Sequence, residues 1–279
     1  MDEDLVRVLM SRQADAGKGR PAGRRKQDRP SVSVVVPALN EEPNLPFVLP
    51  KIPGWIDEVI LVDGHSVDRT CAVACSLLPG IRLVQQQGRG KGAALRAGFD
   101  AAGGDIIVML DADGSTDPNE IPLYVGALVA GAEFVKGTRF AQGAGTADMS
   151  LLRRLGNRLL VFAVRLLFGG RCSDLCYGYM AFWKRVLPRL ELDVDGFEIE
   201  TQMSVKALGS GLKVVEVPSF ESRRLHGKSN LRTIPDGWRV LKTIVREWRL
   251  ARKGGQPQSD VRAEQGGRNV ARKRSQRVF

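Results

Sequence analysis

The sequence has few of the residues that build zinc sites and disulfide frameworks. Its 279 residues include four cysteines and two histidines. The cysteines form two pairs at C-x3-C spacing, Cys71 with Cys75 and Cys172 with Cys176, whereas zinc sites favour C-x2-C or C-x4-C. On a helix the first pair would only stack at positions i and i+4, and buried free cysteines are common. We therefore expect neither a sulfur-bound metal nor a disulfide, which fits a reducing compartment.

Long apolar segments are also lacking. The longest apolar runs, such as residues 159–164, fall far short of the ~18 residues that a membrane-spanning helix needs. The N-terminus is charged and does not resemble a signal peptide. We expect that the chain does not cross a membrane by itself.

The positive charge is concentrated at the two ends of the chain. The net charge is +11, but residues 31–251 hold 26 Lys and Arg against 24 Asp and Glu, or +2. Residues 1–30 and 252–279 are rich in Gly, Gln, Arg and Ser without an apolar period, which predicts disordered basic tails. Such tails are either solvated or attracted to a membrane surface or an acidic partner. The near-neutral middle and the lack of a recognised RNA or DNA module argue against a nucleic-acid-binding protein.

The sequence also lacks the two common phosphate-binding motifs, G-x4-G-K-S/T and G-x-G-x-x-G. The glycine-rich turn at residues 88–92 still offers backbone N–H groups and Lys91 to an anion. The alternative is that these glycines only make a turn.

The strongest positive signal is the stretch at residues 106–115. Five large apolar residues end abruptly in two carboxylates one residue apart, Asp111 and Asp113. So short a run, bounded by glycines, is typical of a central parallel strand, and ligands of open α/β sheets bind just beyond such strand ends. Alternate residues of an extended chain point the same way, so both carboxylates can face one hard cation, Mg2+ or Mn2+. The alternative is an ordinary polar turn.

Strand and helix signals alternate up to residue 130. This alternation predicts an α/β fold with a doubly wound, mostly parallel sheet and flanking helices. We expect one domain over residues 31–232. Its predicted strands are residues 32–36, 59–62, 81–84, 106–110, 134–137 and 214–217.

Two basic amphipathic helices are predicted, at residues 151–168 and 233–251. The first carries four arginines and no acid beside an apolar stripe, and the second has Trp238 and Trp248 beside several basic residues. Helices of this kind can lie in a lipid headgroup layer. The alternative is that each helix packs on the sheet with a solvated basic face.

Several short strings occur in an order that resembles one known family. The strings are residues 35–42, 62–63 with 66–70, 90–94, 111–113, 137–139, 174 with 178–179, and 224 with 226–229. Together they resemble the family-2 glycosyltransferases of the GT-A fold, most of all the dolichyl- or polyprenyl-phosphate sugar synthases. The resemblance covers residues 31–232.

The resemblance implies a donor site, a metal site and an acceptor site. The residues implied to bind the nucleotide sugar are Pro37, Ala38, Asn40, Glu41, Asp63, Lys91, Asp111, Ala112 and Asp113. Asp111 and Asp113, helped by Ser115, would hold Mg2+ or Mn2+ on the sugar diphosphate. The acceptor phosphate would be held by Arg139, Arg153, Arg224 and Lys228. The implied catalytic residues are Asp111, Asp113, Arg139 and Asp174.

The chain departs from the family pattern at one loop. The family usually has two adjacent aspartates where this chain has Asp63 and Gly64, and His65 stands where glycine is usual. Many members also end in transmembrane helices, which the sequence does not show. We therefore expect its lipid contact to come from the two basic amphipathic helices, on the cytoplasmic face of a membrane.

The nature of the acceptor determines whether a catalytic base is needed. A hydroxyl acceptor would require one, and Asp174, Glu198 and Glu200 are the candidates. A lipid phosphate is already anionic, with its second pKa near ~6, and needs cations rather than a base. The surplus of arginines, together with the apolar arginine-rich helix, favours polyprenyl phosphate as the acceptor. With the donor that the resemblance implies, we predict an inverting transfer of hexose from a nucleotide sugar such as GDP-mannose or UDP-glucose to polyprenyl phosphate. The alternative is a soluble family-2 enzyme with a hydroxyl acceptor in polysaccharide or specialised-metabolite synthesis.

Overall fold

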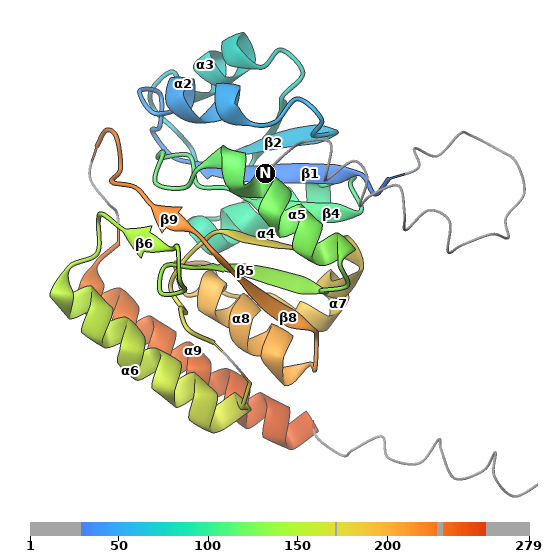
Figure 1. Cartoon of the computed structure of the whole chain (residues 1–279). Helices are drawn as coiled ribbons and strands as arrows, with labels where there is room; N and C mark the ends of the chain where they lie inside the picture. Colours follow the sequence, from blue (N-terminus) through green and yellow to red (C-terminus); the bar gives the residue numbers. More distant parts are fainter. Residues whose placement is uncertain (1–28, 171, 228–230, 255–279) are drawn as a thin grey trace, which may run out of the picture.

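A sheet of seven strands forms the centre of the protein, with helices on both faces (Figure 1). The computed structural model describes residues 29–170, 172–227 and 231–254. The predicted tails therefore lie outside the described residues, except for residues 29–30 and 252–254. The strand order is β3-β2-β1-β4-β7-β5-β8. This mostly parallel α/β sheet confirms the predicted fold class.

The elements follow one another with short connections. The strands are β1 Val32–Ala38, β2 Glu58–Asp63, β3 Arg82–Gln85, β4 Ile106–Met109, β5 Phe134–Thr138, β6 Gly145–Thr146, β7 Met180–Trp183, β8 Val214–Pro218 and β9 Phe220–Glu221. The helices are α2 Leu45–Val48, α3 Thr70–Leu77, α4 Lys91–Ala101, α5 Ile121–Val129, α6 Leu151–Phe168, α7 Leu187–Leu190, α8 Ile199–Gly209 and α9 Thr233–Gly254. Short 3₁₀ turns lie at Leu49–Lys51, Pro118–Glu120 and Lys184–Val186.

The central strands are mostly apolar because both of their faces are covered. All four residues of β4 are buried, and β4 pairs in parallel with β1. Val34 and Val36 of β1 belong to the core beneath α2 and α5, whereas Val35 belongs to the core beneath α4 and α8. Strands buried on both faces lose the alternation of polar and apolar residues. This explains why an apolar run in the sequence, such as residues 106–110, predicts a central strand.

Strand β7 runs antiparallel between β4 and β5. The chain leaves β5, passes through β6 and α6, and re-enters the sheet at the same edge that it left, because β7 runs in the opposite direction. As a result, the segment before β7, residues 174–179, arrives at the same edge as the residues that follow β4. The small parallel pair β6–β9 lies over this edge as well (Figure 1).

Helices α6 and α9 lie side by side below the sheet (Figure 1). Val161 and Val164 of α6 share a buried cluster with Val240 and Ile244 of α9. Helix α6 has the predicted bounds, and α9 continues to Gly254, into the predicted C-terminal tail. Within the described ranges, no helix combines the length and the apolar character needed to span a membrane.

Close contact between α4 and the sheet depends on Gly98. A Cβ at Gly98 would collide with the side chains of Val35 and Val62. We expect Gly98→Ala to lower the free energy of unfolding by about 1–3 kcal/mol through overpacking. Gly126→Ala, inside α5, has no atom within 4 Å of the added Cβ and should instead raise it by up to about 1 kcal/mol. Urea unfolding measures the free energy of unfolding of both variants. An equal change in the two variants would contradict the close approach of α4 to β1.

Candidate active site

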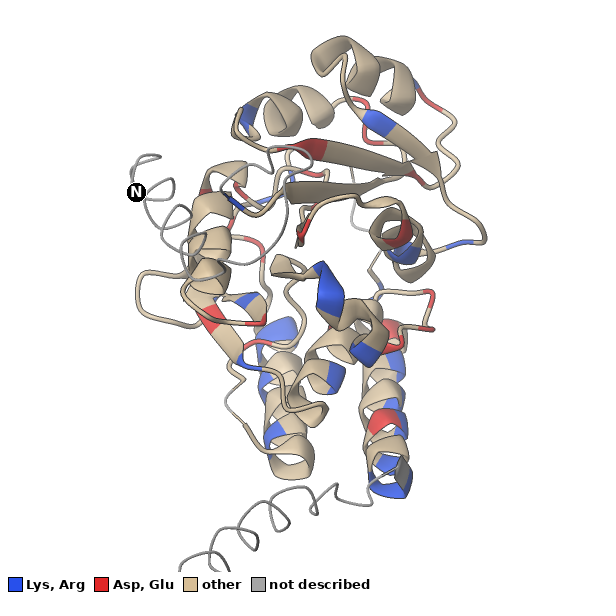
Figure 2. Ribbon diagram, turned by 90° about the vertical axis from the view of Figure 1, so that its right-hand side faces the viewer, with Lys and Arg blue, Asp and Glu red and all other residues tan. Residues whose placement is uncertain are grey.

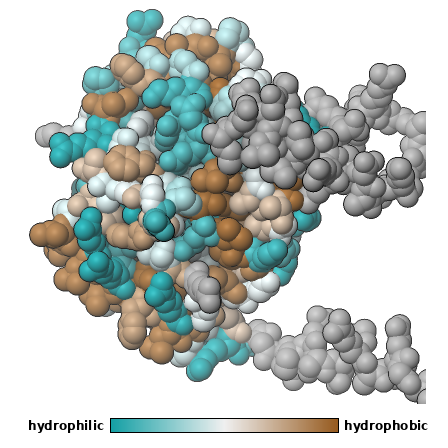
Figure 3. Space-filling view, viewed as in Figure 1, coloured by the Kyte–Doolittle hydropathy of each residue, from teal (hydrophilic) through white to brown (hydrophobic). Residues whose placement is uncertain are grey.

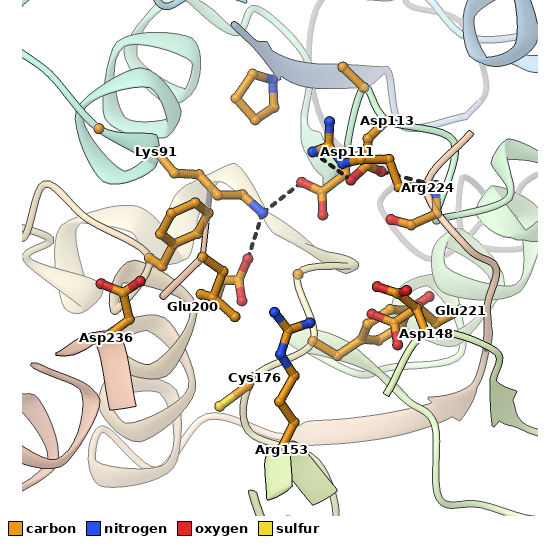
Figure 4. Close-up of a pocket in the computed structure, with 18 of the residues that line it drawn as sticks. Lys91, Asp111, Asp113, Asp148, Arg153, Cys176, Glu200, Glu221, Arg224 and Asp236 are labelled. Carbon is orange, nitrogen blue, oxygen red and sulfur yellow. Dashed lines mark hydrogen bonds and ion pairs between the residues drawn. The ribbon is translucent and has the colours of Figure 1, made fainter. Parts of the chain in front are cut away.

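A cavity of about 1020 Å³ opens at the edge of the sheet where β1, β2, β4 and β5 end (Figure 4). Loops after these strands, the segment before β7, and helices α6, α8 and α9 contribute to its wall. The predicted residues that line it are Pro37, Ala38, Glu41, Lys91, Asp111, Ala112, Asp113, Ser115, Arg139, Arg153, Glu200 and Arg224. The predicted Lys228 lies outside the described residues. The structure thus brings most of the predicted site residues together.

Asn40 and Asp63 do not line the cavity but support its wall. The Asn40 side-chain oxygen accepts the Val67 N–H at 2.8 Å, and the Asn40 N–H donates to Ser66 Oγ at 2.9 Å. The buried Asp63 carboxylate accepts from the Ser66 N–H at 3.2 Å and from Gln85 Nε2 at 3.0 Å. These bonds tie the loop after β1 to the loop after β2. His65, at a positive φ of 68°, lines the cavity in this region.

Lys91 joins two carboxylates across the cavity. Its Nζ lies 2.6 Å from Asp111 Oδ1 and 2.6 Å from Glu200 Oε1 (Figure 4). Burial alone would lower the pKa of Lys91, but the two carboxylates outweigh it and raise that pKa above its ordinary value. Burial raises the pKa of Glu200, and Lys91 opposes this rise. Lys91 therefore stays protonated in the centre of the site.

The glycine-rich turn before α4 packs closely against the backbone at Asp195. The Gly92 N–H donates to the Asp195 carbonyl at 2.7 Å. Gly90 has a positive φ of 101°, and a Cβ there would collide with the Asp195 backbone. The turn thus places the Lys91 side chain in the cavity, while the Gly92 N–H is already used within the protein.

Arg224 bridges Asp113 and Glu41 on the other side of the cavity. Its Nη2 lies 3.0 Å from Asp113 Oδ2, and its Nη1 lies 2.9 Å from Glu41 Oε1. Burial raises the pKa of Glu41, although Asn44 and Arg224 both oppose this. The Ser115 N–H donates to Asp113 Oδ1 at 2.9 Å. Asp113 is therefore held by the backbone of its own loop and by an arginine from a distant one.

The residues after β4 fit a hard divalent cation. Asp111 and Asp113 line one cavity, and Ser115 lines it beside them. Carboxylate and hydroxyl oxygens are ligands that Mg2+ and Mn2+ prefer, and one or two carboxylates suffice when phosphate oxygens and water complete the shell. Among the described residues, no cluster of three or more His, Cys, Asp or Glu could hold a metal. A metal here would therefore rest on the two aspartates together with a bound phosphate.

Arg139 is held from two sides by carboxylates. Asp174 accepts from its Nε at 2.6 Å and from its Nη2 at 2.8 Å, and both Glu221 oxygens accept from its Nη1 at 3.0 Å. Asp174 has no exposed surface and does not line the cavity. This placement does not support the predicted catalytic base at Asp174, which instead positions Arg139. Glu198 does not line the cavity either, whereas Glu200 does.

Arg153 differs from the other two arginines. It rises from the first turn of α6 toward the middle of the cavity (Figure 4). Its Nε donates to Thr233 Oγ1 of α9 at 3.4 Å. In the described part of the chain, no carboxylate lies within ion-pair distance of Arg153, whereas Arg139 and Arg224 each contact two. The charge of Arg153 is therefore available to an anionic ligand.

Comparison with known proteins identifies the family to which this fold and site belong. The Glycosyl transferase family 2 profile matches residues 33–190. The chain belongs to glycosyltransferase family 2. It is a nucleotide-sugar glycosyltransferase of the GT-A fold, which confirms the resemblance seen in its sequence.

Individual relatives of this family-2 glycosyltransferase differ in their acceptors. It is 32% identical over 222 residues to the glycosyltransferase AglJ of Haloferax volcanii, covering 77% of this chain and 71% of that protein. It is 31% identical over 206 residues to the polyprenol monophosphomannose synthase of Mycolicibacterium smegmatis, covering 69% and 78%. The glucosyl-3-phosphoglycerate synthase of Mycobacterium tuberculosis, solved with Mn2+, UDP-glucose and phosphoglyceric acid, superimposes with a TM-score of 0.66 at 25% identity, covering 87% and 83%.

Some residues that line the glycosyltransferase cavity carried no recognised motif. They include Asn157, Glu221 and Asp236. The only available signal was proximity in the sequence to predicted residues. Asn157 follows Arg153 by one helical turn, and Glu221 precedes Arg224 by three residues.

We expect Asp113→Asn to weaken Mn2+ binding in the presence of UDP or GDP by more than about tenfold, because a carboxylate charge is lost. Asp117→Asn is the matched control, since Asp117 caps the Pro118–Glu120 turn and does not line the cavity, and asparagine caps equally well. Electron paramagnetic resonance titration measures the Mn2+ affinity of both variants. Unchanged binding in Asp113→Asn would contradict a metal site at the end of β4.

Proposed function

We propose that this enzyme transfers a hexose from a nucleotide sugar such as GDP-mannose or UDP-glucose to polyprenyl phosphate at a membrane surface, with inversion at the anomeric carbon. The observation that carries the proposal is Arg153, a cation in the cavity with no carboxylate partner among the described residues. The names of relatives that act on polyprenol or dolichol phosphate support the acceptor class.

The donor side is formed by the loop after β1, the N-terminus of α4 and the two aspartates. As the anomeric C–O bond breaks, negative charge grows on the leaving diphosphate. A divalent cation bound to Asp111 and Asp113 would supply Lewis-acid stabilisation of that charge. Lys91, whose pKa lies above its ordinary value, stays protonated at the N-terminus of α4, where helix dipoles also favour anions, but it shares its charge with Asp111 and Glu200.

The acceptor side is formed by arginines rather than by a base. An anionic phosphate oxygen can attack without losing a proton, provided that cations offset its repulsion from the diphosphate. Arg153 meets this need without giving up an existing ion pair. An acceptor that reached Arg139 or Arg224 would have to compete with Glu221 or Asp113. We therefore assign Arg153 the leading role and keep Arg139, Arg224 and Lys228 as secondary proposals.

A hydroxyl acceptor is the alternative, as in a soluble family-2 enzyme of polysaccharide or specialised-metabolite synthesis. It is favoured by Glu200, a buried carboxylate in the cavity whose pKa is raised by burial, as suits a base. Its ion pair with Lys91 works against this role. Under this alternative Glu200→Gln would abolish turnover, whereas Arg153→Ala would be tolerated.

The outer face of α6 suits contact with a membrane. Six large apolar side chains are exposed on it, namely Leu151, Leu152, Leu155, Leu159, Phe162 and Leu166. Figure 3 shows this apolar patch over α6, and Figure 2 shows Lys and Arg gathered around the same end of the molecule. Apolar residues flanked by arginine favour the headgroup layer of anionic lipids. We propose that α6 binds the cytoplasmic face of a membrane peripherally.

Replacing Arg153 tests the acceptor. We expect Arg153→Ala to raise the KM for a phosphate acceptor by at least about tenfold, because charged hydrogen bonds contribute about 1.5–3 kcal/mol. The KM for the nucleotide sugar should change little. Arg154→Ala is the matched control, because Arg154 is the next residue on α6, is exposed and does not line the cavity. Initial rates with a short polyprenyl phosphate measure this, and an unchanged KM would contradict the proposal.

Two acidic substitutions test the membrane contact. We expect Leu159→Glu with Phe162→Glu to weaken binding to vesicles that contain phosphatidylglycerol by at least about tenfold, since burying one large apolar side chain contributes about 1.5–3 kcal/mol. Leu83→Glu is the control, because Leu83 is 41% exposed on β3, away from α6. Co-sedimentation measures vesicle binding by the double variant and by the control. Equal losses in both proteins, or none, would contradict α6 as the membrane-binding face.

A further inference from the structure

The end of the cavity that lies away from α6 and α9 is formed by the ends of β1, β2 and β3. Leu39, Gly64, His65 and Gln86 line it there. In the sheet only β1 separates β2 from β4 (Figure 1), and neighbouring strands lie about 4.8 Å apart. The end of β2 is thus about 10 Å from the end of β4. A ribose can span this gap when a diphosphate lies at the aspartates after β4, so the nucleobase of the donor would lie beside the loop after β2.

The loops after β1 and β2 pack closely next to His65. The Gly64 N–H donates to the Ala38 carbonyl at 2.8 Å. A Cβ at Gly64 would lie 3.2 Å from that carbonyl oxygen and 3.3 Å from Leu39 Cβ, so glycine permits the close contact. Leu39 is 42% exposed and lines the cavity. This end of the cavity therefore offers an apolar side chain, against which a flat ring can pack, beside the polar ring of His65.

His65 has a backbone conformation that is uncommon for a residue with a side chain. Its φ of 68° lies in the left-handed region, which favours glycine, and glycine is usual at this position in the family. The His65 side chain is exposed and lines the cavity, so it adds nothing to the hydrophobic core. Strained backbone positions concentrate at ligand-binding sites. We therefore look for the role of this side chain in the ligand.

Two hydrogen bonds determine which ring nitrogen of His65 carries the proton. Gln85 Nε2 lies 3.0 Å from Asp63 Oδ2 and 3.0 Å from His65 Nδ1. An ionised carboxylate only accepts and an amide nitrogen only donates, so the Gln85 amide donates to both atoms. Nδ1 is therefore an acceptor, and the neutral imidazole carries its proton on Nε2. Within the described part of the chain, Nε2 has no hydrogen-bond partner, so His65 presents an unused N–H donor at the cavity wall.

We propose that His65 selects the nucleobase of the donor, favouring uracil or guanine over cytosine or adenine, and that Gln85 is the positioning residue for its ring. Uracil and guanine carry a carbonyl oxygen where cytosine and adenine carry an amino group. The Nε2–H of His65 can donate to that carbonyl, whereas an amino group would place two donors face to face. This inference rests on the donor side of the proposed function and adds the class of nucleobase. It does not depend on the acceptor.

Nucleotide binding without an acceptor tests the proposal. UDP and CDP differ only in the carbonyl or amino group and the adjoining ring nitrogen, and so do inosine diphosphate and ADP. Calorimetric titration with Mn2+ present measures the Kd of each nucleotide. In the pair that the wild type binds more tightly, we expect at least about a fivefold preference for the carbonyl-bearing nucleotide. His65→Gly should remove this preference, and because glycine adopts a positive φ without strain, the loop should keep its fold.

Gln85→Leu separates the orientation of the His65 ring from its presence. The leucine removes the donor to Nδ1, so the proton can move to either ring nitrogen and the ring is no longer held in one orientation. We expect the preference for the carbonyl-bearing nucleotide to fall by about twofold or more. Val67→Ala is the matched control, because Val67 lies in the same loop, is 91% exposed and does not line the cavity. It should keep the wild-type preference.

The outcomes distinguish this inference from the function on which it rests. If the wild type binds none of the four nucleotides with Mn2+, the donor side of the proposed function fails and the role of His65 fails with it. If the wild type binds them without preference, or His65→Gly keeps the preference seen in Val67→Ala, the role of His65 alone is wrong. A preference lost in His65→Gly but unchanged in Gln85→Leu would overturn Gln85 as the positioning residue.

Discussion

The ion pairs of Lys91 with Asp111 and Glu200 hold the centre of the site together. Asp111 follows β4, Lys91 begins α4 and Glu200 lies in the first turn of α8, so the contact joins elements far apart in the sequence. These groups are mostly withdrawn from water, and removing one partner of a buried pair typically costs about 3–5 kcal/mol. The contact therefore fixes the position of α8 relative to the strand ends, and with it the shape of the cavity.

The arginines of the site divide into two kinds because of their neighbours. Arg139 and Arg224 each contact two carboxylates and mainly hold the loops of the cavity in place. Arg153 extends from a helix terminus without such partners among the described residues. From the sequence alone, the three arginines look equally able to bind an anion. A guanidinium that two carboxylates already neutralise, however, offers an anion little net charge. The available charge is thus concentrated at the N-terminal end of α6, where Arg153 lies in the first turn.

The sheet and the aspartate pair could be predicted because they depend on local patterns. Strand β4 is a continuous apolar run that ends in Asp111 and Asp113, and that pattern is complete within ten residues. The direction of β7 and the ion pairs of Arg139 could not be predicted, because they depend on how the chain returns to the sheet after α6. Asp174 matched the family pattern, yet only the structure shows that both its oxygens bind Arg139. Sequence identifies a charged residue, but its partners decide whether its charge is available.

Three faces of helix α6 contact three different environments. The helix therefore connects the proposed lipid contact with the active site. Val161 and Val164 face the core, Arg153 and Asn157 face the cavity, and the exposed leucines face outward. An α-helix is stiff along its length, so its faces cannot reorient independently. Contact of the outer face with a bilayer would withdraw apolar surface from water and stabilise α6 in this orientation. The same contact would then hold Arg153 ready for the phosphate, so that membrane binding and acceptor binding would reinforce each other.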